Sequence, residues 1–383
     1  MKVQGRWASR SLNWHRAGDE TAVPHMCWQS PTDRHTERQP FSIRRAPCPG
    51  SAVWSHASAG KKEKVAIRPL RGAAALVAIA VLITGTAASG TAASGALRAT
   101  VTPWRLPIPV YRTVAVVSAG RIFVLGGHDS SGGSITSVYS IDPRTGRTAL
   151  AGSLALATHG AAAALVGGRV LVFGGASLTV HNSVQAFNPA SRGSSVVGSM
   201  PGVRADTTAV TVGGVAVLLG GFDGVGPQSS VWSTSDGTAF RVVAHLPQPV
   251  RYPAVASLGT SVYVFGGLIA GGEYNGKFTN DVQQVNLRTG SARIVGHLPA
   301  PLAHAMGSEM GGRLFVFGGS TPSGTSRQML SFNPATMAVL VAGSLPEPIT
   351  DAAVATIGRT AYLLGGISSG PLASITTVRL LGR

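Results

Sequence analysis

The sequence predicts an all-β fold, a six-bladed β-propeller in which each blade is an antiparallel sheet of four strands. The main observation is a motif that occurs six times, in which three or four apolar residues run into two glycines, and successive copies lie 48, 46, 46, 52 and 47 residues apart. That spacing is the length of one supersecondary unit. The 50 glycines and 23 prolines are placed between apolar runs, which is typical of many short strands joined by turns. The glycine pairs are Gly126 and Gly127, Gly174 and Gly175, Gly220 and Gly221, Gly266 and Gly267, Gly318 and Gly319, and Gly365 and Gly366.

Residues 1–64 have no repeat and few aliphatic side chains, and they contain four of the six tryptophans. We expect a disordered, basic N-terminal segment. A translation start nearer Lys61 would remove most of it and leave a conventional export signal. Cys27 and Cys48 both lie in this segment, so the repeats hold neither a disulfide nor a cysteine-based metal site.

Residues 65–97 have the parts of a signal peptide. A basic stretch at 61–71 precedes the uncharged apolar run 72–84, and small residues follow at 85–96. The uncharged stretch 72–97 is also long enough for a single transmembrane helix, so cleavage and anchoring both remain open. Either outcome exports or anchors the protein and places the repeats outside the cytoplasm.

Residues 98–383 contain the repeats. In most units a Leu-Pro or Met-Pro turn comes first, then an apolar run, a tight glycine turn, the run into Gly-Gly, a loop, a third strand and a fourth. The last unit lacks a fourth strand, and the spare segment 98–105 is expected to supply it and so to join the two ends of the ring. The blades are expected at about 106–153, 154–200, 201–246, 247–298, 299–345 and 346–383.

The glycine pairs have a structural explanation. The second strand of a blade ends there between neighbouring blades, and glycine permits positive φ without a Cβ. No Lys-Ser or Lys-Thr follows any pair, so none is a phosphate-binding loop.

These units resemble the kelch repeat, the diglycine-marked blade that also forms the central domain of galactose oxidase. Tyr139 stands where kelch blades carry a tyrosine, and Phe187, Trp232 and Phe332 are near substitutes, whereas the usual fourth-strand tryptophan is mostly replaced. The resemblance covers residues 98–383 and implies a kelch-type propeller of a bacterial exported protein. The copper site of galactose oxidase uses a Cys-linked tyrosine, and because the repeats lack cysteine we expect neither that cofactor nor another.

Aligning the units on the glycine pairs reveals one polar level in otherwise apolar first strands. The column fourteen residues before each first glycine reads Arg112, Gly160, Asp206, Tyr252, His304 and Asp351. His159 and Arg251 fall one residue earlier in their units, and His128 and Glu273 lie on loops that reach the same end of the propeller. These side chains are the candidate ligand-binding site at the channel mouth: Arg112, His159, Asp206, Arg251, Tyr252, His304, Asp351, His128 and Glu273.

A purely structural role is the competing interpretation of the same column. Arg112 would pair with Asp351 across one blade boundary, and Arg251 with Asp206, because a buried charge without a partner is costly. Within its own column Asp206 has no basic neighbour in an adjacent blade. His128, His159 and His304 come from different blades, and we expect no metal site.

The net charge of +17 is spread over the chain, with the arginines of the repeats scattered one or two per unit. This pattern favours a solvated basic surface over a nucleic-acid site, which needs a clustered patch with stacking aromatics. The absence of a Gly-x-Ser-x-Gly elbow or other strong catalytic motif favours a binding or scaffold module for a protein or polar ligand. The alternative is a carbohydrate-active enzyme, by analogy with the six-bladed kelch mutarotase that acts on sialic acid. In that case Arg112 or Arg251 would hold a carboxylate, and His304 or Glu273 would act as acid or base.

Overall fold

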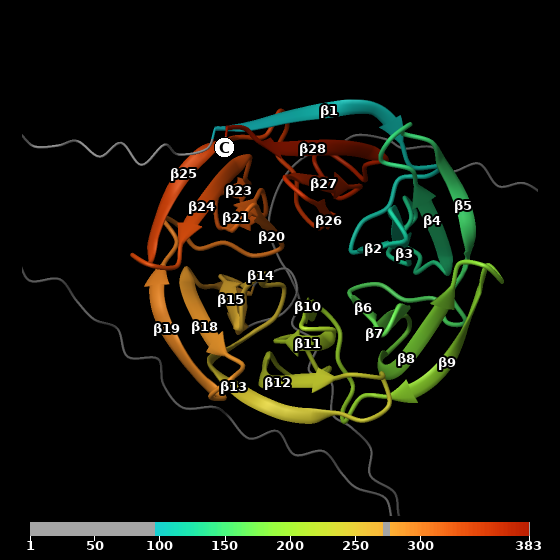
Figure 1. Cartoon of the computed structure of the whole chain (residues 1–383), viewed down its shortest axis with the longest axis horizontal. Coiled ribbons are helices and arrows are strands. Elements are labelled where there is room, and N and C mark those ends of the chain that lie inside the picture. Colours follow the sequence, from blue (N-terminus) through green and yellow to red (C-terminus); the bar gives the residue numbers. More distant parts are fainter. Residues whose placement is uncertain (1–95, 271–275, 383) are drawn as a thin grey trace, which may run out of the picture. The chain divides into compact units, whose positions relative to one another are not determined.

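The computed structural model describes residues 96–270 and 276–382. Within these residues the chain forms 28 strands and no helix, which confirms the predicted all-β propeller with six four-stranded antiparallel sheets (Figure 1). None of the described segments is a helix suited to crossing a membrane. The expected disordered segment 1–64, nearly all of segment 65–97 and the candidate Glu273 lie outside the described residues.

Each of the first three blades is built from consecutive strands, and the first strand of each is innermost. Blade one comprises β2 (Val114–Ser118), β3 (Arg121–Leu125), β4 (Ser137–Ile141) and β5 (Thr148–Ser153). Blade two comprises β6 (Ala162–Val166), β7 (Arg169–Ala176), β8 (Val180–Asn188) and β9 (Gly193–Ser199). Blade three comprises β10 (Thr208–Val212), β11 (Val215–Leu219), β12 (Gln228–Thr234) and β13 (Arg241–Val250).

Two of the remaining blades carry a short extra hairpin in the loop between their second and third strands. Blade four comprises β14 (Ala254–Leu258), β15 (Ser261–Phe265), β18 (Asp281–Asn286) and β19 (Ser291–His297), with the hairpin β16 (Leu268–Ala270) and β17 (Lys277–Phe278). Blade five comprises β20 (Met306–Met310), β21 (Arg313–Phe317), β24 (Gln328–Asn333) and β25 (Ala338–Ser344), with the hairpin β22 (Ser320–Thr321) and β23 (Gly324–Thr325).

The sixth blade joins the two ends of the described chain. Its inner strands are β26 (Ala353–Ile357), β27 (Thr360–Leu364) and β28 (Ser374–Leu380), and its outermost strand is β1 (Leu97–Arg105), which pairs antiparallel with β28 (Figure 1). Leu97 lies opposite Leu380 in this pairing, and the Leu381 amide donates to the Ala96 carbonyl at 2.8 Å. The spare segment that includes Trp104 therefore fills the place of a fourth strand.

The hydrophobic core lies between neighbouring blades. Phe173 of blade two packs with Leu218 and Trp232 of blade three, and Ile122 of blade one packs with Tyr362 of blade six. Each fully buried side chain of this size contributes about 1.5–3 kcal/mol. All cluster members lie between residues 97 and 380, so the propeller is complete within this part of the chain.

The glycine pairs stand where one blade touches the next. Gly266 has a φ of 61° and Gly267 a φ of 113°. The Gly267 amide donates to the Leu302 carbonyl of blade five at 2.8 Å, and a Cβ on Gly266 would lie only 2.0 Å from that oxygen. Both the positive φ and the close approach thus require glycine.

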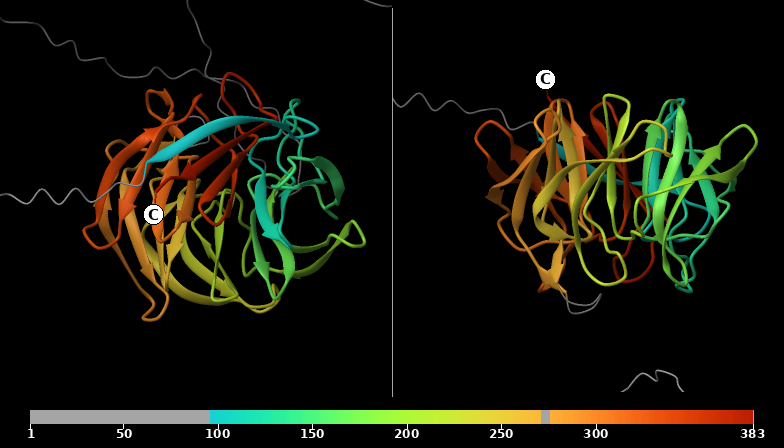
Figure 2. Two further views of the ribbon diagram at one scale, coloured as in Figure 1. Left: turned by 45° about the horizontal axis from the view of Figure 1, so that its top comes forward. Right: turned by 90° about the horizontal axis from the view of Figure 1, so that it is seen from below.

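The antiparallel blades give the propeller two faces that differ in composition. The turns between first and second strands and between third and fourth strands lie at one end, which we call the turn face. The loops between second and third strands and the connections between blades lie at the other end, which we call the ring face (Figure 2). The polar column of the sequence precedes the first strands and so belongs to the ring face.

Candidate functional site

The polar column forms a closed ring of backbone hydrogen bonds around the channel. In each blade the column residue donates its amide to the carbonyl of the column residue in the preceding blade, at 2.6–3.1 Å. The circuit closes because the Arg112 amide donates to the Asp351 carbonyl at 2.9 Å. We call this set the polar ring: Arg112, Gly160, Asp206, Tyr252, His304 and Asp351.

Every member of the polar ring has a left-handed backbone, with φ between 50° and 58°. Five of the eight described non-glycine residues with positive φ belong to it. Glycine, Asp and His adopt this conformation more readily than other residues, which accounts for part of the ring's composition. Arg112 and Tyr252 have no such preference, and each costs about 1–2 kcal/mol there. Both side chains make contacts with other groups at the channel mouth.

The side chains of Arg112 and Tyr252 meet across the channel. They come from blades one and four, which lie opposite each other in the ring, and the Arg112 guanidinium donates a hydrogen bond to the Tyr252 hydroxyl. The Tyr252 ring also stacks on the His304 imidazole, with 3.8 Å between centroids. This contact joins Arg112 to the other half of the ring and bridges the mouth with polar groups.

Asp351 anchors the adjacent part of the polar ring. Its Oδ1 lies 2.7 Å from His304 Nδ1 and 3.9 Å from Arg112 Nε. Burial raises the pKa of Asp351, but the attraction of His304 and its hydrogen bond, together with Arg112, outweigh burial and bring the pKa below its ordinary value. The carboxylate is thus ionised and holds the imidazole in one orientation.

Asp206 is the least solvated acid of the polar ring. Burial raises its pKa to about 6, against the opposing effects of Arg112, a hydrogen bond from Tyr252 and the more weakly acting Arg251 and His304. Its Oδ2 lies 3.9 Å from Arg251 Nη1. Arg112, which belongs to the same column, therefore lowers the pKa of Asp206 as well. The pairing expected from the sequence gave Asp206 only Arg251, from the adjacent blade.

Arg251 lies just outside the polar ring and is almost fully buried. Its guanidinium lies over the Phe222 ring, 4.7 Å from the centroid, and also near Tyr252. Phe222 is a contact that the sequence interpretation missed, although it directly follows the third glycine pair, in the same register as the candidate His128. With Arg112, Asp206 and Asp351, Arg251 makes the site balanced in formal charge.

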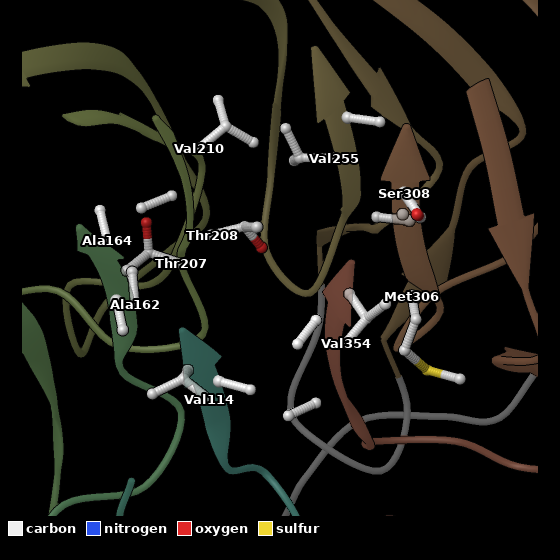
Figure 3. A pocket seen from close by; sticks show the side chains of 18 of the residues that line it. Val114, Ala162, Ala164, Thr207, Thr208, Val210, Val255, Met306, Ser308 and Val354 are labelled. Carbon is white, nitrogen blue, oxygen red and sulfur yellow. The ribbon is translucent and has the colours of Figure 1, made fainter. Parts of the chain in front are cut away.

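The channel below the polar ring is a cavity of about 550 Å³ (Figure 3). It is lined by the six first strands, mainly by Ala, Val and Thr side chains, and Glu309 is the one ionisable residue among the described lining residues below the polar ring. Along β6 the partly exposed Ala163 and Leu165 alternate with buried residues, as expected for a strand with one side toward a cavity. The site is therefore a polar mouth above a narrow apolar channel.

A second cluster lies beside the polar ring between blades one and two. His159 Nδ1 lies 2.8 Å from the Ser134 hydroxyl, and the His159 ring stacks on His128 at 3.8 Å. Burial lowers the pKa of His159 to about 3, with further contributions from His128, Arg112 and His181. His159 is therefore neutral near pH 7 and offers hydrogen-bonding atoms rather than charge. Among residues 96–270 and 276–382, no group of three or more His, Cys, Asp or Glu is arranged to hold a metal ion.

The structure thus brings six of the nine candidates together: Arg112, Asp206, Arg251, Tyr252, His304 and Asp351. His128 and His159 form the neighbouring cluster. Their assignment to a ligand site remains a prediction.

Comparisons with known proteins agree with this architecture. A model described as the Kelch motif matches residues 109–147. The protein named "Kelch repeat and BTB domain-containing protein 12" of Danio rerio is 34% identical over 93 residues, which cover 22% of this chain and 15% of that protein. A solved structure titled "Structure of YjhT" matches with a TM-score of 0.62 over 72% of this chain and 98% of that chain, at 14% identity. At that identity the likeness shows the fold alone.

Proposed function

We propose that this chain, a kelch-repeat β-propeller, binds a polar ligand or an exposed polar group of a protein partner at its polar ring. Kelch propellers as a class suggest a protein-binding or scaffold module, and the polar ring specifies where such recognition would occur. Loops and strand ends on a rigid scaffold are the usual places for binding residues.

The observation that carries the proposal is the left-handed backbone of Arg112 and Tyr252. If these positions only had to close the ring of backbone hydrogen bonds, glycine would adopt the left-handed backbone at a lower free-energy cost, as it does at Gly160. Instead, a guanidinium, a phenol, an imidazole and two carboxylates converge on the mouth of a cavity of about 550 Å³. A few convergent polar groups over an apolar cavity are typical of a small-molecule or side-chain pocket.

The composition of the polar ring indicates the chemistry of the ligand. Arg112 is suited to a carboxylate, whereas Asp206 and Asp351 accept hydrogen bonds from hydroxyl or amine groups. A sugar acid, or the carboxylate of an acidic peptide, presents such groups. Binding would replace the hydrogen bond between Arg112 and Tyr252 by bonds to the ligand.

A calorimetric titration with a panel of sugar acids, neutral sugars and acidic peptides tests the proposal. For any compound of the panel that binds, Arg112→Met should weaken binding at least about tenfold, because a charge-assisted hydrogen bond contributes about 1.5–3 kcal/mol. Arg241→Met on the turn face is the matched control and should leave affinity unchanged. Equal affinity for Arg112→Met and the parent protein would place the binding site elsewhere.

A second candidate, a sugar mutarotase, is favoured by the pair of His304 and Asp351 at 2.7 Å together with Asp206 at a pKa of about 6. Opening and closing a hemiacetal requires a base for the anomeric hydroxyl and an acid for the ring oxygen, and a carboxyl group with a raised pKa, such as Asp206, suits the acid role. Mutarotation of a bound sugar followed by NMR should slow by about tenfold or more in His304→Gln. Binding without any catalysed mutarotation would favour the module over the enzyme.

We also propose that the propeller works outside the cytoplasm. The support is the order of the basic residues 61–71, the apolar run 72–84 and the small residues 85–96. N-terminal sequencing of the mature protein tests this. A first residue near 90–97 would indicate a cleaved signal peptide, and a peptide from residues 10–50 in a protein retained in the cytoplasm would contradict export.

A further inference from the structure

The arginines that are scattered through the repeats gather on one face of the propeller. They recur because they occupy equivalent turns, either between first and second strands or between third and fourth strands, and both sets of turns lie on the turn face. Nine arginines are placed there: Arg121, Arg144, Arg147, Arg169, Arg192, Arg241, Arg288, Arg313 and Arg359. All except the half-buried Arg359 are exposed.

Few acidic residues compensate this charge. In the same turns and strand ends the described acids are Asp142, which lies 3.8 Å from Arg121, Asp236, and Glu309 near the channel end. The described loops and connections of the ring face, counted with the strand ends next to them, by contrast carry six basic and six acidic residues. The excess positive charge of the described propeller is therefore concentrated on the turn face.

The chain also reaches the propeller at the turn face. β1 begins there, since Leu97 lies opposite Leu380 and Ala96 accepts the hydrogen bond from Leu381 (Figure 2). The apolar run 72–84 ends only twelve residues before β1. Twelve residues reach at most about 40 Å when fully extended, so an apolar run held in a bilayer would tether the propeller within that distance of the lipid surface, through the edge of its turn face.

A rim of exposed aliphatic side chains surrounds the turn face. Five outer strands each carry at least one exposed aliphatic side chain among the first four residues of the strand, at the end that lies on this face. The exposed fractions of these side chains range from 44% to 61%. The side chains are Leu150, Val196, Val242, Ile294, Leu340 and Val341. Leu178 and Val225 in ring-face loops are more exposed still, at 100% and 92%, so the excess of arginines is what distinguishes the turn face. Basic side chains beside apolar ones favour binding at the interface of a bilayer.

We propose that the turn face docks on a membrane surface that contains anionic phospholipids, with the polar ring facing away from the bilayer. The arginines contact the lipid headgroups, and the aliphatic rim enters the boundary between headgroups and acyl chains. Each exposed arginine near such a surface strengthens binding roughly fivefold at low ionic strength. The orientation leaves the proposed ligand site open to the solution.

Nucleic acid fits the turn face less well than a membrane does. Binding of single strands relies on aromatic side chains that stack with bases. None of the large hydrophobic residues exposed in the described part of the chain is aromatic. Nucleic-acid binding would also leave the aliphatic rim and the apolar run ahead of β1 without a partner.

Vesicle sedimentation of residues 96–383, which contain every strand and core cluster of the closed ring, tests the proposal without the apolar run. The fragment should bind vesicles of phosphatidylglycerol and phosphatidylcholine at 50 mM NaCl, bind pure phosphatidylcholine at least about tenfold more weakly, and dissociate at 500 mM NaCl. Arg144→Gln with Arg147→Gln should weaken binding to the anionic vesicles roughly 25-fold at most and at least about fivefold.

The matched control removes two exposed cations from the ring face, Arg105→Gln with Lys277→Gln, and should change binding less than about twofold. Arg241→Gln with Arg288→Gln repeats the test on blades three and four if the first pair disturbs folding. Equal losses for turn-face and ring-face pairs would overturn the orientation. No preference for anionic vesicles, or tighter binding to single-stranded DNA at the same salt concentration, would overturn the membrane proposal.

Discussion

Replacing Asp206 by Asn tests the electrostatics of the polar ring without disturbing its backbone. Asp206 is 8% exposed, has a φ of 55°, and its pKa is raised to about 6 from 3.8. Asn has nearly the same shape and tolerates the left-handed conformation at least as well. The substitution therefore removes the buried carboxylate charge, and with it a counter-charge of Arg251, an attraction that the pKa of about 6 already includes.

The expected gain in the free energy of unfolding follows from the shift in the pKa of Asp206. Between about pH 4 and pH 6 the native state binds more protons at Asp206 than the unfolded state does, so the free energy of unfolding falls as pH rises through this window and stays lower above it. A difference of about two pH units corresponds to roughly 3 kcal/mol. At pH 7.5 Asp206→Asn should thus be more stable than the parent by up to about 3 kcal/mol, or about 5 °C in Tm. Near pH 3.5 the two proteins should differ little.

Urea unfolding of both proteins from pH 3.5 to pH 7.5 measures this difference, and the other titrating groups cancel in the comparison. Asp129→Asn is the control. Hydrogen bonds from Ser131 lower the pKa of the exposed Asp129, so that substitution should destabilise the protein more at pH 7.5 than at pH 3.5. The reasoning fails if Asp206→Asn shows a pH-independent difference, because the ring would then compensate the Asp206 charge in full.

Three further predictions concern other parts of the propeller. His159→Phe keeps a ring against His128 but removes a group whose pKa is lowered to about 3. A His with a lowered pKa reduces the free energy of unfolding as pH falls from about 6.5 toward 3. In urea unfolding the variant should therefore lose less stability than the parent between pH 7.5 and pH 5. Gly146→Ala should destabilise the protein more than Gly168→Ala. Both glycines have left-handed backbones, but a Cβ at Gly146 would lie 1.9 Å from Trp104 Nε1, whereas a Cβ at Gly168 would meet open space. Equal losses of stability would show that Trp104 moves aside freely. Deleting residues 97–105 should lower Tm by more than about 10 °C, because β28 becomes an exposed edge, and calorimetry showing an unchanged Tm would mean that β1 does not stabilise the ring.

The architecture could be predicted from the sequence because it rests on local rules. Gly266 and Gly267 mark a strand end by their conformational freedom, and equal spacing of such pairs counts the blades. The polar column follows from the same alignment, since equivalent positions in equivalent blades lie at one level of the channel. The all-β, six-bladed fold needed nothing beyond these regularities.

Contacts between distant blades could not be predicted in this way. Arg112 meets Tyr252 across the channel, 140 residues along the chain, because the ring closes with blades one and four opposite each other and the channel is narrow enough for a guanidinium to reach a phenol. The pKa of Asp206 likewise depends on burial and on Arg112, neither of which an alignment measures.

The distribution of charge shows the same division between sequence and tertiary structure. The sequence by itself determined the number of arginines and their recurrence in turns, and their spacing along the chain suggested a diffuse basic surface. The tertiary structure decided that they share one face, because antiparallel strands send alternate turns to opposite ends and the ring aligns those ends in all six blades. Coulomb interactions depend on distance in space rather than along the chain, so a charge pattern that is dispersed in sequence becomes one basic surface in the folded propeller.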